Sequence, residues 1–265
     1  MQITIGDLGI FLMIILGMVM GSFITMASYR LAIENGKILD LLIAPSSCTK
    51  CGKKLKLFNL FPIFSWVFQG GRCTFCGAKI SIRYPIIEII SAISFATIYL
   101  ILDRKMNMEL VLTLLIFVIL FIMIITDLEN YFIPDVTQVI LFILGILYHF
   151  FVTFNDNSHH LFYYFFSSFI YLVFGIILHY IFLYLTNQNG IGVDDIKFFA
   201  VAGFIIGIEK FALFMFLSGI CGVIFGAIWQ KIKEDNTFPF APSLVFSLAI
   251  SMLIDFNDIA NNLLL

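Results

Sequence analysis

Two aspartates stand where apolar segments begin or end. Asp127 closes one apolar run in IITDLENYFIPD, and Asp195 opens another in GIGVDDIKFFA. Acidic residues at a membrane boundary are costly to desolvate and usually have a function. If the two helix ends meet, the two carboxylates share a proton, so that one activates water while the other acts as an acid. The pattern predicts an aspartic protease dyad of Asp127 and Asp195.

Each aspartate also has a structural interpretation. Asp is a favoured helix N-cap, so Asp194 or Asp195 could simply start the helix that follows, and Asp135 could do the same after Pro134. Asp127 does not fit this interpretation, because the C-terminal end of a helix disfavours negative charge. Asp194 stays open as an alternative to Asp195 for the working acid.

Four cysteines form the pattern C-x2-C-x21-C-x2-C, namely Cys48, Cys51, Cys73 and Cys76. Four thiolates complete the tetrahedral shell of a structural zinc ion, and a glycine follows each pair, where a tight turn favours a residue without Cβ. The alternative is two disulfides, which a reducing compartment would disfavour. We expect structural zinc, since four protein thiolates leave no open position for catalysis.

The composition is that of a membrane protein. The chain is 61% hydrophobic and 12% charged, about half the charged fraction of soluble domains, and its mean hydropathy is +1.05. A net charge of −2 gives no indication of nucleic-acid binding. These values predict an all-α polytopic membrane protein embedded in the lipid bilayer.

Uncharged segments give the expected helices. There are eight, at residues 8–29, 84–102, 110–126, 136–155, 161–185, 198–208, 211–230 and 237–254. Seven have roughly the ~17–25 residues that a spanning helix needs. The sixth has eleven uncharged residues, which rise about 16 Å in a helix, half of the ~30 Å hydrocarbon core. We expect about eight transmembrane helices, with the sixth unusually short.

Basic residues set the expected orientation. Nine of the fifteen Lys and Arg residues lie from Arg30 to Arg83, against two acids, which places this loop in the cytoplasm. Counting spans onward brings Asp127 and Asp195 to the cytoplasmic face as well, provided that the sixth segment spans. The predicted organisation is a first transmembrane helix (1–29), a small zinc-stapled cytoplasmic loop domain (30–84) and a transmembrane aspartic peptidase domain (85–265).

Five stretches in this order resemble the type IV prepilin peptidases, over most of the chain. They are GSFITMASYRL (21–31), the cysteine loop with the segment after it (46–90), DLENYFIPD (127–135), GIGVDDIKFFA (190–200) and FPFAPSL (238–244). Two departures stand out. Asp194 occupies the position of a family glycine, and Thr25 and Met26 replace the Asn and Val that the family favours.

The resemblance implies a bifunctional enzyme of the bacterial inner membrane. Such enzymes cut the leader from type IV prepilins and pseudopilins at the cytoplasmic face. They then N-methylate the new N-terminal residue with S-adenosylmethionine, using residues of the cysteine loop. The catalytic aspartates of the family map onto Asp127 and Asp195.

Two other function classes compete with this interpretation. A non-enzymatic scaffold of pilus or secretion machinery would keep the helices and the zinc loop, and the Asp194 departure favours it. A transporter with a proton relay would need ionisable residues near the middle of the spans, whereas these acids sit at the ends.

Overall fold

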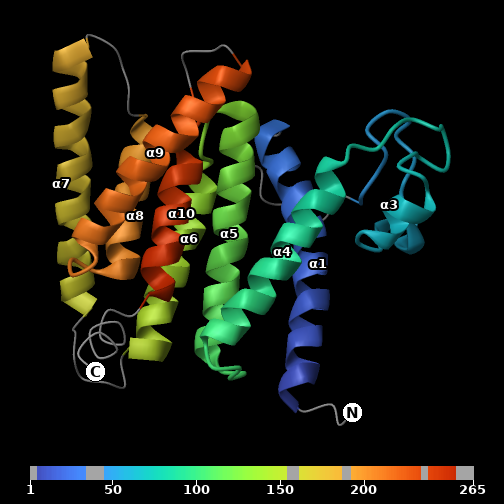
Figure 1. The fold of residues 1–265 in the computed structure, drawn as a ribbon, viewed down its shortest axis with the longest axis horizontal. Helices are drawn as coiled ribbons and strands as arrows, with labels where there is room; N and C mark the ends of the chain where they lie inside the picture. Colours follow the sequence, from blue (N-terminus) through green and yellow to red (C-terminus); the bar gives the residue numbers. More distant parts are fainter. Residues whose placement is uncertain (1–4, 34–44, 154–160, 187–191, 234–237, 255–265) are drawn as a thin grey trace. The chain divides into compact units, whose positions relative to one another are not determined.

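The computed structural model describes residues 5–33, 45–153, 161–186, 192–233 and 238–254 (Figure 1). The long helices are α1 (Ile5–Ile33), α4 (Arg83–Ile101), α5 (Met108–Asn130), α6 (Asp135–Tyr148), α7 (Leu161–Thr186), α8 (Val193–Ile206), α9 (Phe211–Lys233) and α10 (Ala241–Leu253). Shorter pieces are a 3₁₀ turn (Leu57–Leu60), α3 (Phe64–Phe68) and a π-helical turn (His149–Thr153). The described residues contain no strand, which confirms the all-α prediction.

The eight long helices match the eight expected segments, although α8 and α10 are short. Among the described residues, six helices are long and apolar enough to cross a membrane, and α6 reaches that length together with the π-helical turn that follows it. The α8 helix begins at Val193, before the uncharged run, because both aspartates lie in its first turn. The expected spanning length of the last segment is wrong, because α10 has only 13 residues. The reason is Pro239 and Pro242, which confine the helix start to Ala241.

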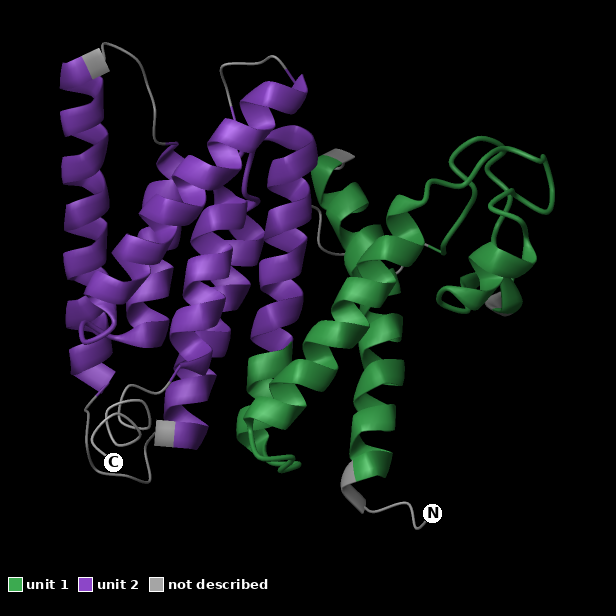
Figure 2. Ribbon diagram, in the orientation of Figure 1, with its two compact units in different colours: residues 1–114 green, residues 115–265 purple. Residues whose placement is uncertain are grey.

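The chain forms two compact units, residues 1–114 and 115–265 (Figure 2). In the first, α1 and α4 pack backbone to backbone. A Cβ on Gly17 would lie 2.6 Å from the Cα of Ala92, and one on Gly21 would lie 2.6 Å from the Cα of Glu88. Glycines four residues apart let membrane helices approach this closely. The functional boundary expected at residues 84 and 85 is a separate matter and stays a prediction.

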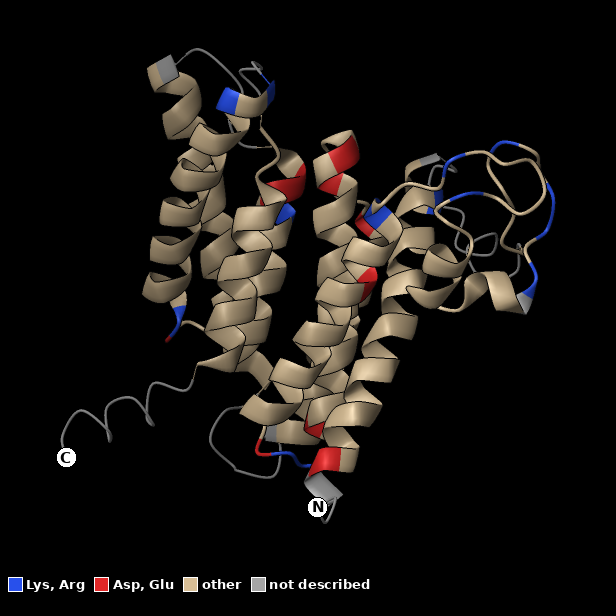
Figure 3. Ribbon diagram, turned by 45° about the vertical axis from the view of Figure 1, so that its right-hand side comes forward, with Lys and Arg blue, Asp and Glu red and all other residues tan. Residues whose placement is uncertain are grey.

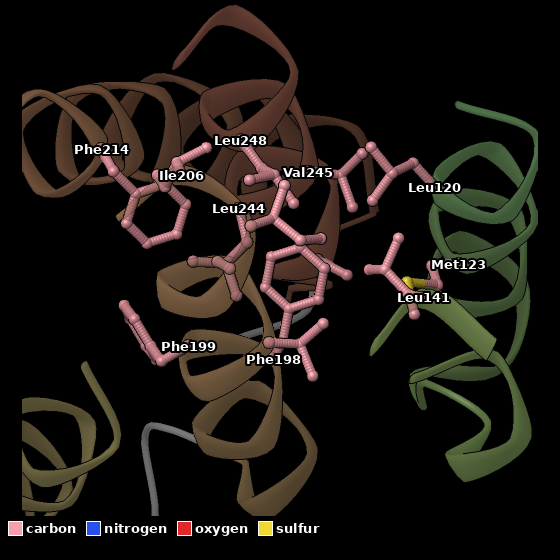
Figure 4. Close-up of a cluster of buried hydrophobic side chains, with 14 of the residues drawn as sticks. Leu120, Met123, Leu141, Phe198, Phe199, Ile206, Phe214, Leu244, Val245 and Leu248 are labelled. Atoms are coloured by element: carbon pink, nitrogen blue, oxygen red, sulfur yellow. The ribbon is translucent and has the colours of Figure 1, made fainter. Parts of the chain in front are cut away.

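The second unit is built around α8. Its residues from Phe198 to Ile206 are buried except Ala200, which is half-buried, and the helix packs against α6, α7 and α10. Phe198 and Phe199 meet Phe214 and Leu244 in one apolar cluster (Figure 4). A helix that is apolar all round is an interior helix. This position explains why so short a helix is stable.

Candidate functional site

Asp127 is buried near the end of α5, with 6% of its surface exposed. Its Oδ2 accepts a hydrogen bond of 2.8 Å from the backbone N–H of Ala241, the first residue of α10. The first N–H groups of a helix have no partner within the helix, and the helix dipole is positive there. The start of α10 therefore compensates the carboxylate that the end of α5 disfavours.

Asp195 lies in the first turn of α8 and is half-buried. Its Oδ2 accepts a hydrogen bond of 3.1 Å from the N–H of Gly192, which is the N-cap residue of α8, so Asp195 is not the N-cap itself but binds the N-cap backbone from the third helical position. Capping does not account for its whole environment, because the negative charges of Asp127 and Asp194 both act on the Asp195 carboxyl. The second unit thus brings the two predicted acids into electrostatic contact.

Asp194 takes part in a bridge between helices. Lys197 Nζ lies 3.3 Å from Asp194 Oδ1 and 2.6 Å from Asp135 Oδ1 at the start of α6. Gln138 Nε2 donates a 3.0 Å hydrogen bond to the carbonyl of Asp194. Asp135 follows the N-cap residue Pro134, so its prediction as a cap is wrong. The lysine holds the extra carboxylate in an ion pair and ties α6 to α8.

Four helix ends therefore converge, the C-terminal end of α5 and the N-terminal ends of α6, α8 and α10. The backbone N–H groups at the starts of α8 and α10 bond the two acids and offset part of the cost of burying negative charge there. Sequence reasoning found Asp127 and Asp195 but missed the N–H of Ala241 and the side chain of Gln138. The FPFAPSL stretch was the available signal for Ala241, because a proline marks the first turn of a helix, where backbone N–H groups have no partner within the helix.

The four predicted zinc ligands lie together within the first unit. All their Sγ atoms are within 4.8 Å of one another, and those of Cys48 and Cys76 are 3.9 Å apart. A tetrahedral zinc site with Zn–S bonds of ~2.3 Å requires sulfur atoms about 3.8 Å apart. All five cysteines of the chain are free thiols, and Cys221 lies apart from the cluster in α9. The arrangement fits one metal ion better than two disulfides.

Two similar turns build this cluster. Gly52 and Gly77 have φ of 69° and 71°, as the glycine prediction requires. Their N–H groups donate to the carbonyls of Cys48 and Cys73 at 2.8 and 2.9 Å. A short antiparallel bridge closes each turn, pairing Ser47 with Lys54 and Arg72 with Lys79.

Without a cation, the local electrostatics favour a thiolate at Cys48 and disfavour one at Cys76. Backbone N–H groups of Cys51 and Lys50 lower the pKa of Cys48 to about 6. The backbone at Ala78 also favours the Cys76 thiolate, yet burial and the neighbouring thiols raise the pKa of Cys76 to about 11. Four negative sulfurs this close repel one another, and a divalent cation removes that repulsion.

Glu88 links the cysteine loop to α4. Its Oε2 accepts a 2.6 Å hydrogen bond from the N–H of Ile63, whose φ is 60°. The side chain is buried, and this bond holds the loop to α4. The start of α4 is in turn bonded to α1, because Arg83 Nη2 donates to Ser28 Oγ at 2.8 Å. The loop is thus attached to α4, and α4 to α1.

One buried histidine escaped the sequence analysis. His149 Nε2 lies 2.9 Å from the carbonyl of Phe204, and its ring stacks on Tyr164 at 3.5 Å. These contacts join the π-helical turn after α6 to the last turns of α8. We interpret the residue as structural.

Two family matches cover most of the chain. Residues 15–102 match the bacterial peptidase A24 N-terminal domain, and residues 114–227 match the type IV leader peptidase family. The first match lies within the first compact unit and the second lies almost wholly within the second unit, and the second match contains both Asp127 and Asp195.

Curated relatives are similar along nearly their whole length. A prepilin leader peptidase/N-methyltransferase of Bacillus subtilis (strain 168) is 27% identical over 91% of this chain and 93% of its own. Proteins of the same name from Pectobacterium carotovorum subsp. carotovorum and Neisseria gonorrhoeae are each 25% identical, over 91% and 88% of this chain and 91% and 86% of their own. No solved structure matches the chain. With six helices able to span a membrane and both halves of the sequence matched, this multi-pass bacterial membrane protein belongs to the type IV leader peptidase family.

Proposed function

We propose that this protein cleaves the leader peptide from type IV prepilins or pseudopilins, using Asp127 and Asp195 as an aspartic dyad. Family membership and the names of the relatives support the reaction. The observation that carries the choice of residues is the meeting of four helix ends, where Asp127 is buried against the start of α10 and its charge acts on Asp195.

The dyad hydrolyses the scissile amide without a covalent intermediate. The ionised carboxylate takes a proton from water, and the water oxygen bonds to the amide carbon. The protonated carboxyl stabilises the carbonyl oxygen, and a proton passes to the leaving nitrogen as the C–N bond breaks. The products are a carboxylic acid and a free amine, and together they contain all the atoms of the peptide and of one water molecule. Two acids sharing one proton suffice for this cycle.

The position of the dyad suits a membrane-anchored substrate. The acids stand at helix ends beside long apolar spans, so a peptide bond next to a hydrophobic transmembrane segment could reach them where that segment surfaces. The basic loop 30–84 supports a cytoplasmic location for this face. We therefore place the cleavage at the cytoplasmic side of the inner membrane.

The second activity in the proposal is N-methylation of the new amino terminus. S-adenosylmethionine supplies the methyl group, and the freed amine accepts it. Cys48, Cys51, Cys73 and Cys76 would hold zinc, which organises the loop that the family resemblance associates with methyl transfer. No residue is assigned to the methyl donor.

Leader cleavage of a prepilin in membranes tests the dyad. Wild type is compared with Asp127→Asn, Asp195→Asn and Asp194→Asn. Each dyad variant is expected to lose at least about a thousandfold in rate, because one of the two proton carriers is gone. Asp194→Asn is expected to keep cleavage, since Asp194 is held by Lys197.

The outcome also separates the enzyme from the scaffold alternative. Cleavage that survives in all three variants would remove the dyad from the proposal. If the wild type supports pilus assembly without cleaving any prepilin, and Asp127→Asn does too, the scaffold is the better description. Loss only in Asp194→Asn and Asp127→Asn would make Asp194 the partner of Asp127.

A further inference from the structure

The cysteine loop exposes a cluster of large apolar side chains that the zinc site does not use. It is named here the aromatic patch and consists of Phe58, Phe61, Phe64, Val67 and Phe68. Phe58 is 88% exposed and Phe68 86%, which is rare for phenylalanine in a folded region. The patch lies over the 3₁₀ turn and α3, and its phenylalanines line a cavity of about 560 Å³. Exposed apolar patches of this kind mark interaction surfaces.

The conformation of this segment is held in place, so the exposure is not that of a loose chain. Trp66 packs behind the patch, and its Nε1 donates to the carbonyl of Ile80 at 3.2 Å. Gly71 sits against the Trp66 ring, where an added Cβ would come within 2.9 Å. Ile63 is fixed by its bond to Glu88. The same fold that half-buries Trp66 leaves the phenylalanines exposed.

The charges around the patch indicate what covers it. The loop carries Lys50, Lys53, Lys54 and Lys56 just before the patch, and α3 itself carries no charge. Figure 3 shows the basic positions following the loop while α3 stays uncharged. An apolar surface bordered by cations matches the headgroup region of an anionic membrane, where phenylalanines enter the acyl boundary and lysines meet phosphates.

The attachment of the loop to α4 keeps the aromatic patch close to the headgroup region of the membrane. The loop is continuous with α4 and bonded to it through Glu88, and α4 is one of the helices able to span the bilayer. A segment tied to a span needs little binding energy to stay on the membrane, because its effective concentration there is already high. We propose that the aromatic patch docks onto the anionic lipid surface of the bilayer that holds the spans, and so anchors the zinc loop against the membrane.

Lipid quenching of an added tryptophan tests this docking in the full chain. Phe68→Trp is reconstituted in vesicles of phosphatidylcholine and phosphatidylglycerol, with or without bromines in the acyl chains. The matched control is Phe75→Trp, in the second cysteine turn, where the ring lies under Lys53 and only 39% is exposed. The wild type supplies the background of Trp66 and Trp229. Retained metal content shows that both variants keep the loop folded.

Docking predicts that brominated lipid quenches the fluorescence added at position 68 at least about twofold more than that added at position 75. Quenching is expected to weaken when phosphatidylglycerol is replaced by phosphatidylcholine or when salt rises from 50 mM to 500 mM. Quenching at position 68 by aqueous acrylamide but not by brominated lipid would overturn the proposal. Shielding from both quenchers would assign the patch to another part of this protein or to a second copy. Equal lipid quenching with and without phosphatidylglycerol would contradict the proposal that the patch docks onto anionic lipid.

Discussion

At the scale of single residues, the most informative position is Asp194. A carboxylate beside a dyad adds negative charge where a shared proton must be balanced. The structure shows how this chain tolerates it, since Lys197 lies between Asp194 and Asp135. Lys197 thus compensates the negative charge that Asp194 adds in place of the family glycine. The Asp194 departure therefore supports the scaffold alternative less strongly.

Lys197 is expected to be a positioning residue. Lys197→Met leaves Asp135 and Asp194 without their cation, and exposed ion pairs are worth about 0.2–1 kcal/mol each. We expect the rate of leader cleavage to fall about 2- to 10-fold, with the pH profile displaced, while Lys197→Arg keeps a rate near wild type. Lys233→Met, at the end of α9, is the matched control. An unchanged rate and pH profile in Lys197→Met would contradict this role.

The zinc ligands allow an equally local prediction. Cys73→Ser removes one of four thiolates, and a structural site with three loses most of its affinity for zinc. We expect purified Cys73→Ser to contain well under one equivalent of zinc by elemental analysis, and its loop to be cut faster by protease. Cys221→Ser is the control, because that thiol lies apart in α9. Equal zinc content in the two variants would count against the site.

At the scale of elements, α8 matters most, because it carries Asp195 in its first turn and then runs through the interior of the second unit. Its contact with α7 depends on a glycine. A Cβ at Gly203 would come within 2.5 Å of the Tyr171 ring, which is completely buried. The two helices approach as closely as small residues permit, and this contact fixes the depth of α8.

Gly203→Ala is therefore expected to destabilise the protein by about 1–3 kcal/mol, since a buried ring cannot yield easily. The measurement is the loss of folded protein on heating in detergent, with Gly219→Ala as control. The control is close because Gly219 also lies in a helix and has open space around its Cβ position. A melting temperature equal to that of Gly219→Ala would show that Tyr171 moves without cost.

At the scale of the whole molecule, the number of spans sets the topology. Six helices have the length of spans, and α8, with 14 residues, rises about 21 Å. Whether α8 crosses the bilayer decides on which face α9 ends. The positive-inside count with α8 as a span places Lys105 outside and Lys231 inside.

Impermeant thiol labelling of intact protoplasts checks this arrangement. Lys105→Cys is expected to react from outside, and Lys231→Cys only after the membrane is opened. The Lys105 side chain is 67% exposed, so accessibility does not limit the first reaction. The parent chain, with its five native cysteines, gives the background. Labelling of Lys231→Cys on intact protoplasts would show that α8 does not span.

The sequence by itself determined what depends on short-range pattern. Apolar runs gave the eight helices, because a helix in lipid satisfies its own backbone hydrogen bonds. Repeated cysteine spacing gave the two turns of the metal cluster, because each turn is a local structure. The charges at Asp127 and Asp195 stood out against apolar neighbours, which made them candidates before any fold was known.

Only the tertiary structure decided which helix ends meet. The bond from Ala241 to Asp127 joins residues 114 positions apart, and Lys197 reaches Asp135 across 62. Such contacts depend on how whole helices pack, which no local pattern encodes. The same holds for the short α10 and for the exposure of the aromatic patch. Phe58 and Phe198 are alike in sequence, yet one is 88% exposed and the other is fully buried, because burial belongs to the packed assembly.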